Sequence, residues 1–366
     1  MKIATIIGAR PQFIKAAMVN KAIQKHNMEG KRHEITEVIL HTGQHYDDKM
    51  SAVFFRELNI PEPDLNLGVG SGPHGQQTGQ MLIRIEEVLI SEKPNWVLVY
   101  GDTNSTLAGA LAAAKLRIPI AHVEAGLRSF NRNMPEEYNR VLTDHCSDLL
   151  FCPTQTAVQN LKHEGITKGV YWVGDIMYDS ILHNIKIAEK NSRILEKLDL
   201  RPKDYSLATI HRAENTDEPK KLKSIFSALD KIAQNGQHII VPLHPRTRKK
   251  LNDSETCPLK NLVLTNPVSY LDMLLLEKQA KAIFTDSGGV QKEAFWFAVP
   301  CVTLRNETEW VETVETGWNY LAGTDKQSII RAFNATSNSK LNTPPNLFGD
   351  GNAGNLILQH LISASL

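Results

Sequence analysis

The fold of this chain is decided by the stretch Ala282-Ile283-Phe284-Thr285-Asp286-Ser287-Gly288-Gly289-Val290-Gln291-Lys292-Glu293-Ala294. An apolar run typical of a buried strand leads into two glycines and then into a segment of helical character. Such a turn lets backbone N–H groups and the positive end of a helix dipole face a phosphate. Glu293 would repel phosphates but could bind the neutral hydroxyls of a ribose. The stretch therefore predicts a nucleotide site, and the alternative is an ordinary strand-to-helix turn closed by Ser287, Gly288 and Gly289.

Short apolar runs alternate with amphipathic stretches on both sides of this turn, which is typical of parallel strands joined by helices. We expect an α/β protein with two Rossmann-like domains, a boundary near Gly174, and domain limits of 1–174 and 175–354. The predicted strands are Ile3–Ile7, Glu37–His41, Trp96–Tyr100, Ile118–Val123, Leu149–Cys152 and Tyr171–Val173, then Ser206–Ile210, His238–Leu243, Leu262–Leu264, Ala282–Thr285 and Cys301–Leu304.

The composition excludes several classes of protein. The chain has 366 residues, enough for two domains, and its 41 Lys and Arg against 40 Asp and Glu give a net charge of +1. This balance argues against nucleic acid as a partner. No segment has the length of a membrane span or of a signal-peptide core, so we expect a cytoplasmic protein without membrane attachment. The four cysteines have no metal-ligand or disulfide spacing: Cys146, Cys152, Cys257 and Cys301.

Charged side chains follow the predicted strands of the first half, where ligands of parallel sheets bind. Arg10 and Lys15 lie around the start of the first helix and suit a diphosphate, unless they are merely solvated. The next strands deliver Asp102 and Glu124 to the same edge. Asp102 alone would be read as a helix cap, since Thr-Asn-Ser follows it. Two carboxylates on neighbouring strands indicate acid or base chemistry more strongly than one.

Further candidates come from a helix start and from the second half. Glu136 and Arg140 are four residues apart on a predicted helix, an arrangement that is also typical of an ordinary surface ion pair. His211 and His244 each end a predicted strand with an arginine close by, which favours an anion-facing surface. The first domain thus offers carboxylates and the second offers the Ser287 turn, so we expect them to face each other across an interdomain cleft.

Several motifs together resemble the non-hydrolysing UDP-N-acetylglucosamine 2-epimerases, which share the two-domain architecture of GT-B glycosyltransferases. The similarity runs almost end to end. The matching motifs are Gly8-Ala9-Arg10-Pro11, Gly101-Asp102-Thr103, His122-Val123-Glu124-Ala125-Gly126-Leu127-Arg128, Pro135-Glu136-Glu137-Tyr138-Asn139-Arg140, His211-Arg212 and Thr285-Asp286-Ser287-Gly288-Gly289-Val290-Gln291-Lys292-Glu293.

The resemblance implies a role for each candidate residue. Carboxylates at positions 102, 124 and 136 would be catalytic, and His211 would be catalytic or contact a phosphate. The cations would bind or neutralise the diphosphate, the Ser-Gly-Gly turn would hold its oxygens, and Glu293 would take the ribose. The last helix, about residues 355–366, would pack back on the first domain. The full set is Asp102, Glu124, Glu136 and His211 as catalytic residues, with Arg10, Lys15, Arg140, His244, Ser287, Gly288, Gly289 and Glu293 as substrate-binding residues.

The resemblance also implies the chemistry. The hydrogen at C2 of a 2-acetamido sugar is not acidic, so the family eliminates UDP across C1–C2 to give a glycal, and UDP then re-adds. Cations and the helix N-terminus would stabilise the departing diphosphate, while carboxylates would stabilise C1 and move the C2 proton. We expect a homodimer, a UDP-sugar as the ligand, and neither a cofactor nor a metal.

Departures from the family pattern bear on the sugar. The chain has Gly8-Ala9-Arg10-Pro11-Gln12 and Glu309-Trp310-Val311-Glu312, a pairing that resembles the branch acting on UDP-2,3-diacetamido-2,3-dideoxyglucuronate. Archaeal UDP-N-acetylglucosamine epimerases share much of this character, so both sugars stay open. Gln44-His45-Tyr46-Asp47 replaces the Gln-x-x-Gln of allosterically activated enzymes. Three further functions are compatible with the same motifs: a GT-B glycosyltransferase, a hydrolysing epimerase and a non-catalytic sugar sensor.

Overall fold

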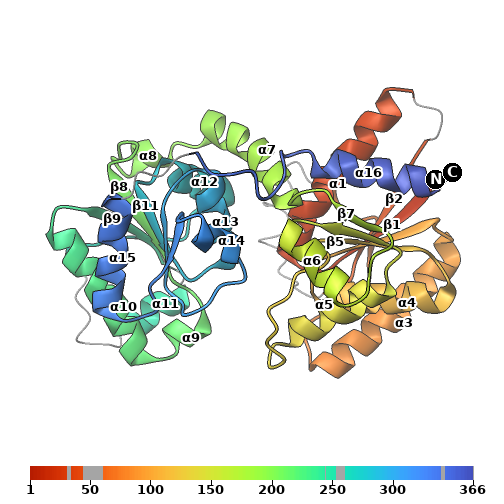
Figure 1. Cartoon of the computed structure of the whole chain (residues 1–366), viewed down its shortest axis with the longest axis horizontal. Helices are drawn as coiled ribbons and strands as arrows, with labels where there is room; N and C mark the ends of the chain where they lie inside the picture. The colour runs from red at the N-terminus through yellow and green to blue at the C-terminus, as the bar shows by residue number, and fades with distance from the viewer. Residues whose placement is uncertain (31–33, 44–60, 244, 253–259, 339–342, 366) are drawn as a thin grey trace. The chain divides into compact units, whose positions relative to one another are not determined.

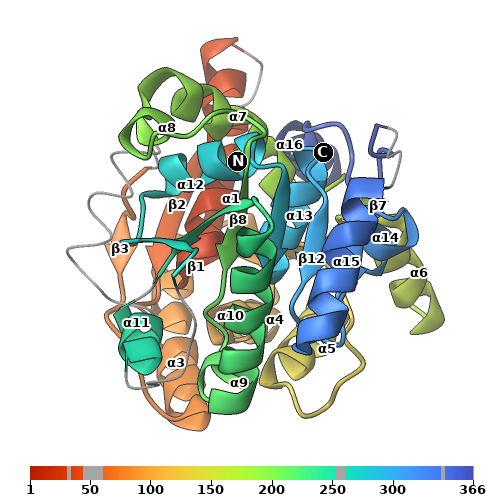
Figure 2. The same cartoon turned by 90° about the vertical axis from the view of Figure 1, so that its left-hand side faces the viewer.

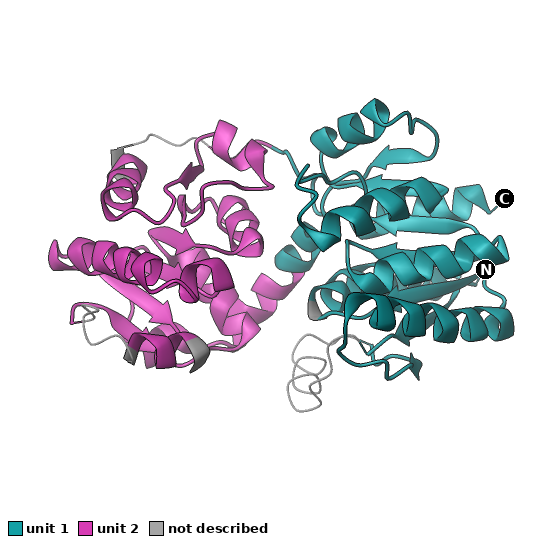
Figure 3. Ribbon diagram, turned by 90° about the horizontal axis from the view of Figure 1, so that it is seen from below, with its two compact units in different colours: residues 1–182, 346–366 teal, residues 183–345 magenta. Residues whose placement is uncertain are grey.

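The computed structural model describes residues 1–30, 34–43, 61–243, 245–252, 260–338 and 343–365. The chain forms two compact units (Figures 1 and 3): unit 1 comprises residues 1–182 and 346–366, and unit 2 comprises residues 183–345. The division falls inside helix α7 (Ile176–Asn191). The boundary expected near residue 174 lies just before this helix. No change in composition marks the point within α7 where the units divide, so the sequence does not indicate it.

Unit 1 is built on a parallel sheet of seven strands in the order β3-β2-β1-β4-β5-β6-β7. The predicted strands are found within two residues of their expected ends. The short edge strand β3 was not predicted, because two exposed residues carry no apolar pattern. The strands are β1 (Lys2–Ile7), β2 (Thr36–His41), β3 (Leu65–Asn66), β4 (Trp96–Tyr100), β5 (Ile120–Val123), β6 (Leu149–Cys152) and β7 (Val170–Trp172).

Helices cover both faces of this sheet, with α1 and α16 on one side and α3 and α4 on the other (Figure 1). Ile6 and Val99 of the sheet pack with the alanine-rich helix α4 in one buried cluster. A Cβ atom at Gly109 would come within 2.8 Å of Ile6, so glycine permits this close approach. The helices are α1 (Arg10–Met28), α3 (His74–Glu92), α4 (Asn104–Leu116), α5 (Pro135–Cys146), α6 (Gln155–His163) and α16 (Ala353–Ala364).

The C-terminal helix α16 belongs to unit 1, although unit 2 intervenes in the sequence. Asp179 accepts hydrogen bonds from the first amides of α16, Ala353 at 3.2 Å and Gly354 at 3.0 Å. A Cβ atom at Gly354 would lie 2.9 Å from the carbonyl oxygen of Met18, so α16 packs closely on α1. The chain thus returns to unit 1, where Asp179 caps the N-terminus of α16.

Unit 2 holds a parallel sheet of six strands in the order β10-β9-β8-β11-β12-β13. Helices α10 and α15 lie side by side over one face (Figure 2), and both contribute to the buried cluster of this unit. The strands are β8 (Tyr205–Thr209), β9 (His238–Pro242), β10 (Val263–Thr265), β11 (Ala282–Thr285), β12 (Cys301–Thr303) and the unpredicted β13 (Asn319–Leu321). The helices are α8 (Ile194–Lys197), α9 (Ala213–Thr216), α10 (Pro219–Gln234), α11 (Pro245–Asn252), α12 (Tyr270–Gln279), α13 (Gly288–Trp296), α14 (Val311–Glu315) and α15 (Lys326–Asn338).

The α/β class and the two parallel sheets are as the sequence predicted. Among the helices that the structure describes, none combines the length and the apolar character that crossing a bilayer requires. Likewise, the described residues contain no group of three or more His, Cys, Asp or Glu side chains arranged to hold a metal ion.

Candidate active site

Asp102 and Glu124 stand at the carboxyl ends of the neighbouring strands β4 and β5. Gly101 brings them together: a Cβ atom at this glycine would be 3.2 Å from Oε2 of Glu124, so the Glu124 carboxylate extends over the turn that carries Asp102. Glu124 itself has a φ of 75°, in the left-handed region that non-glycine residues rarely adopt. Such a conformation persists only where the surroundings hold it, and it is common at functional sites.

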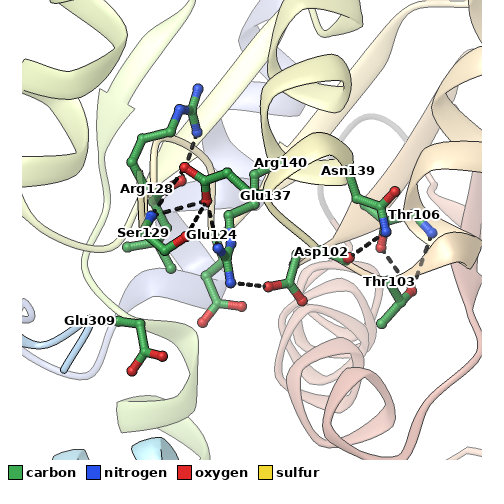
Figure 4. A network of polar contacts seen from close by, with 12 residues as sticks. Asp102, Thr103, Thr106, Glu124, Arg128, Ser129, Glu137, Asn139, Arg140 and Glu309 are labelled. Carbon is green, nitrogen blue, oxygen red and sulfur yellow. Dashed lines mark hydrogen bonds and ion pairs between the residues drawn. The ribbon is translucent and has the colours of Figure 1, made fainter. Parts of the chain in front are cut away.

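Each of these carboxylates is paired with a cation from a different helix. Lys15 of α1 is buried and forms an ion pair with Glu124. Burial by itself would lower the pKa of Lys15, but the charge and hydrogen bond of Glu124 outweigh it and raise that pKa. Arg140 of α5 donates from Nη2 to Asp102 Oδ2 at 2.6 Å (Figure 4). Both carboxylates therefore have a fixed orientation at the sheet edge.

Helix α5 holds the turn of Asp102 in a second way and also orders the loop that precedes it. Asn139 donates to the backbone carbonyl of Asp102 at 2.9 Å. The buried Glu137 carboxylate accepts from Arg140 Nη1 at 2.7 Å and from the Ser129 amide at 3.0 Å (Figure 4). It also accepts from the Phe130 amide at 2.8 Å. Burial would raise the pKa of Glu137, but the bonds from Ser129 and Arg140 lower it below its ordinary value.

Glu136 is exposed on α5, unlike its neighbour Glu137. The sequence suggested that Glu136 shares a helix face with Arg140. In the structure the two Nη groups of Arg140 bind Asp102 and Glu137 instead. Residues three and four positions apart are both neighbours on a helix, so Arg140 could pair with either glutamate. Its bond to Asp102 orients the guanidinium toward Glu137.

In unit 2, Ser287 caps the N-terminus of α13, and its Oγ accepts from the Val290 amide at 3.5 Å. Gly288 and Gly289 are the first two residues of that helix. The first amides of a helix have no partner within it, and the helix dipole is positive at this end. The predicted strand, turn and helix are thus present with the polarity that an anion requires.

The Asp286 side chain connects the loop after β8 to the turn before α13. Its buried carboxylate accepts from the His211 amide at 3.2 Å and from the Arg212 amide at 3.1 Å. The imidazole Nδ1 of His211 lies 3.4 Å from Asp286, while 54% of the His211 side chain remains exposed. The backbone of this loop is therefore fixed, and the ring stays accessible at the same edge as Ser287.

Glu293 lies one helical turn after the glycines and is buried beside Glu277 of α12. Both oxygens of Glu277 are buried and receive no hydrogen bond from a described N–H or O–H donor. Burial, and next the charge of Glu293, raise the pKa of Glu277 well above its ordinary range, and burial also raises the pKa of Glu293. The two adjacent carboxyl groups therefore hold a proton between them more tightly than two free glutamates would.

A sequence model described as UDP-N-acetylglucosamine 2-epimerase matches residues 28–362. The chain belongs to this family. The enzyme is 56% identical over 369 residues to a UDP-N-acetylglucosamine 2-epimerase homolog of Methanococcus maripaludis, covering 99% of both chains. It is 50% identical to the UDP-2,3-diacetamido-2,3-dideoxy-D-glucuronate 2-epimerase of Pseudomonas aeruginosa, again over 99% of both.

Its fold matches a solved member of the family. The crystal structure of the Methanocaldococcus jannaschii UDP-GlcNAc 2-epimerase, in complex with UDP-GlcNAc and UDP, superposes with a TM-score of 0.86 at 48% identity, covering 99% of this chain and all of that one. The GT-B-like architecture expected from the sequence is confirmed. The enzyme is an isomerase, as its family membership implies.

The candidate residues of this epimerase fall in both units, and some lie beyond what the structure describes. Arg10 begins α1, but its side chain is not described. His244 lies outside the described residues, as does Gln44-His45-Tyr46-Asp47. The remaining candidates lie in two groups: Lys15, Asp102, Glu124, Glu136 and Arg140 in unit 1, and His211, Ser287, Gly288, Gly289 and Glu293 in unit 2.

Sequence reasoning missed Glu137 and did not predict the contacts of Gln12. The buried Gln12 side chain accepts from the Gly8 amide at 2.7 Å and donates to the Tyr100 carbonyl at 2.6 Å and to Thr106 at 2.9 Å. The Gln12 side chain thus connects the loop after β1 to the end of β4. The donor and acceptor groups of the Gln12 side chain are therefore occupied by bonds within unit 1.

Proposed function

We propose that this enzyme interconverts UDP-N-acetylglucosamine and its C2 epimer, UDP-N-acetylmannosamine, without net hydrolysis. The observation that carries the proposal is the pair Asp102 and Glu124, brought to one sheet edge and each held by a cation, in a chain of this family. Carboxylates fixed in this way can take and return a proton at a defined point of the sugar.

The proposed reaction runs through elimination and re-addition. The C1–O bond to UDP breaks, UDP leaves with the electron pair, and a carboxylate takes the proton from C2, so that a C1=C2 double bond forms. A proton then returns to the opposite face of C2 and UDP re-adds at C1. Asp102, Glu124 and Glu136 are the candidates for these proton transfers, and we assign the steps to them jointly.

The UDP side of the proposal rests on unit 2. The amides of Gly288 and Gly289 would donate to phosphate oxygens, Ser287 would add its hydroxyl, and Glu293 would bind the ribose hydroxyls. His211 is accessible and would stabilise charge on the departing diphosphate. Four further cationic side chains would bind the substrate: Arg10, Lys15, Arg140 and His244.

The experiment is incubation with UDP-N-acetylglucosamine in deuterated water. We expect the manno epimer to appear with one deuterium at C2, and deuterium to enter the recovered starting sugar as well. Release of free sugar with stoichiometric UDP would indicate a hydrolysing enzyme. Absence of deuterium from both this sugar and the diacetamido uronate would refute the proposal.

A second candidate substrate is UDP-2,3-diacetamido-2,3-dideoxyglucuronate, favoured by the 50% identity to the Pseudomonas aeruginosa enzyme. The chemistry at C1 and C2 would be the same, and the difference would lie in groups that face C3 and C6. Turnover of the two sugars measured side by side, as kcat/KM, decides between them.

We also propose that the enzyme is a cytoplasmic homodimer, as expected from the sequence. Apolar side chains on α3 and α5 support an interface: Ile83 is 57% exposed, Ile90 57%, Tyr138 53% and Leu142 46%. Light scattering after gel filtration should give about twice the chain mass of 40.9 kDa. A mass equal to one chain at micromolar concentration would exclude the dimer.

A further inference from the structure

A buried histidine–aspartate pair contacts the two loops that carry the candidate carboxylates. His122, two residues before Glu124 on β5, points its Nδ1 at Asp144 Oδ1 of α5 at 2.6 Å. His122 and Asp144 are each only 1% exposed. Neither side chain can reach a substrate from this depth, so their contribution to the proposed reaction must act through other residues.

Each member of the pair also holds one of the two loops. His122 Nε2 faces the Gly101 carbonyl oxygen at 2.8 Å, and this carbonyl belongs to the peptide that leads into Asp102. Asp144 Oδ2 accepts from the Gly126 amide at 3.0 Å, two residues after Glu124. Since each ring nitrogen faces an acceptor oxygen, both contacts form together when both nitrogens carry hydrogen.

The pair is part of a buried network with its polar groups satisfied. Arg128 donates to Asp144 Oδ2 at 2.8 Å and binds Glu164 through Nε and Nη2, both at 2.7 Å. Burial would raise the pKa of Asp144, but His122 and Arg128 outweigh it and lower that pKa. A network of this kind is rigid because every charged member has an opposite partner.

We propose that His122 and Asp144 are positioning residues that fix the loops of Asp102 and Glu124 relative to each other. The inference rests on the proposed function of those two carboxylates. Glu124 holds a strained backbone and reaches over Gly101, so small displacements of either loop would separate the carboxylates. In reactions that depend on orientation, a misplacement of about 1 Å can cost about 100-fold in rate.

Two substitutions of His122 separate the two contacts. An asparagine places its amide nitrogen near the position of Nδ1, so His122→Asn keeps the bond to Asp144 and loses that to Gly101. A glutamine reaches the position of Nε2, so His122→Gln does the reverse. Glu164→Gln is the matched control, because it weakens the outer end of the network and leaves both loop contacts in place.

We expect kcat to fall about 100-fold in His122→Asn and about tenfold in His122→Gln, with KM and the Kd for UDP within about threefold of wild type. Glu164→Gln should keep its kcat within about threefold even if its Tm falls. A kcat in His122→Asn within threefold of wild type would overturn the inference. A loss of kcat in Glu164→Gln equal to that in His122→Asn would do the same.

Hydrogen–deuterium exchange of the free enzyme tests the positioning without any reaction. His122→Asn should accelerate exchange in peptides covering residues 101–103, and His122→Gln in peptides covering 124–128. If one variant does not fold, the other and the wild type still decide, since each variant loosens a different loop. Unchanged exchange in both loops would overturn the inference, and this holds even if neither sugar is turned over and the proposed function fails.

Discussion

Glu136 and Glu137 are adjacent in the sequence, but their side chains lie in different surroundings on helix α5. Glu136 is exposed, whereas Glu137 is buried under four donors from Ser129, Phe130 and Arg140. A group that must meet a substrate has to stay accessible, and a group that organises a loop does not. The neighbouring glutamates therefore offer a matched pair of variants.

Glu137→Gln should destabilise unit 1, and Glu136→Gln should not. Breaking a buried pair costs about 3 kcal/mol, which corresponds to a Tm about 6–12 °C lower for a unit of this size. Thermal unfolding at pH 7 measures this difference, and deuterium exchange at C2 should be lost in Glu136→Gln at unchanged Tm. Since the pKa of Glu137 is lowered, its stabilisation is present at neutral pH and is lost as the pH falls through that pKa. Equal Tm values for the two variants would contradict the assignment.

Glu277 should make unit 2 less stable as the pH rises. Burial, and then the charge of Glu293, raise its pKa in the folded state above the value of about 4.5 of a free glutamate, so the folded state binds the proton more tightly than the unfolded state. The stabilisation is full below about pH 4 and is lost as the pH increases through the raised pKa.

Glu277→Gln should remove this dependence, because an amide donates to Glu293 at every pH. We expect its Tm to exceed that of wild type at pH 8 and to approach it at pH 5, as followed by circular dichroism. Glu196→Gln is the control, since that side chain is 72% exposed in its ion pair with Arg193. A Tm difference between Glu277→Gln and wild type that does not change with pH would contradict the shared proton.

Helix α5 contributes several of the described contacts that orient the candidate residues of unit 1. Its buried residues Glu137, Asn139, Thr143 and Asp144 occupy one face, together with Arg140. The sequence predicts the helix from Pro135 and the acids of its first turn. It does not predict which face is buried. Polar residues occur on every side of this helix, and the partners that decide, the acceptor Asp102 and the donor Ser129, belong to other segments.

The close packing of α16 on α1 gives a prediction at the same scale. A methyl group at Gly354 would meet the Met18 carbonyl at 2.9 Å, so Gly354→Ala should displace α16 and cost about 1–3 kcal/mol. Gly79→Ala in the exposed part of α3 is the control: nothing lies within 4 Å of its Cβ position, and alanine should stabilise that helix by about 1 kcal/mol. Chemical denaturation measures both, and equal effects would contradict the close approach.

At the scale of the whole molecule, the candidate residues divide between the units: the proposed proton-transfer groups lie in unit 1 and the proposed anion-binding turn in unit 2. Asp102→Asn should therefore abolish deuterium exchange while the Kd for UDP stays within about threefold of wild type. Isothermal titration and mass spectrometry of the sugar give the two readouts. Full exchange activity in this variant would remove Asp102 from the mechanism.

The alternation of apolar runs predicted the strands of both sheets, because the apolar pattern of a buried strand is contained within its own few residues. Pairings across the fold were not predictable in this way. Gln12 belongs to a motif that resembles one branch of the family, and its side chain binds the Tyr100 carbonyl, 88 residues away in the sequence. Lys15 resembled a phosphate ligand, and the structure pairs it with Glu124, 109 residues away. Such partners depend on which strand ends become neighbours, and only the folded chain shows this.

The concentration of contacts on α5 has a consequence for laboratory evolution of this enzyme. Arg140 binds Glu137 and shares Asp102 as a partner with Asn139, so the effects of substitutions at these three positions on fitness should be strongly epistatic. A library that varies these positions one at a time would return mostly inactive clones, and useful combinations would appear only when codons are exchanged together. The exposed positions Tyr138 and Leu142 lie outside that polar network, so substitutions there should affect the proposed interface between subunits and leave these contacts in place.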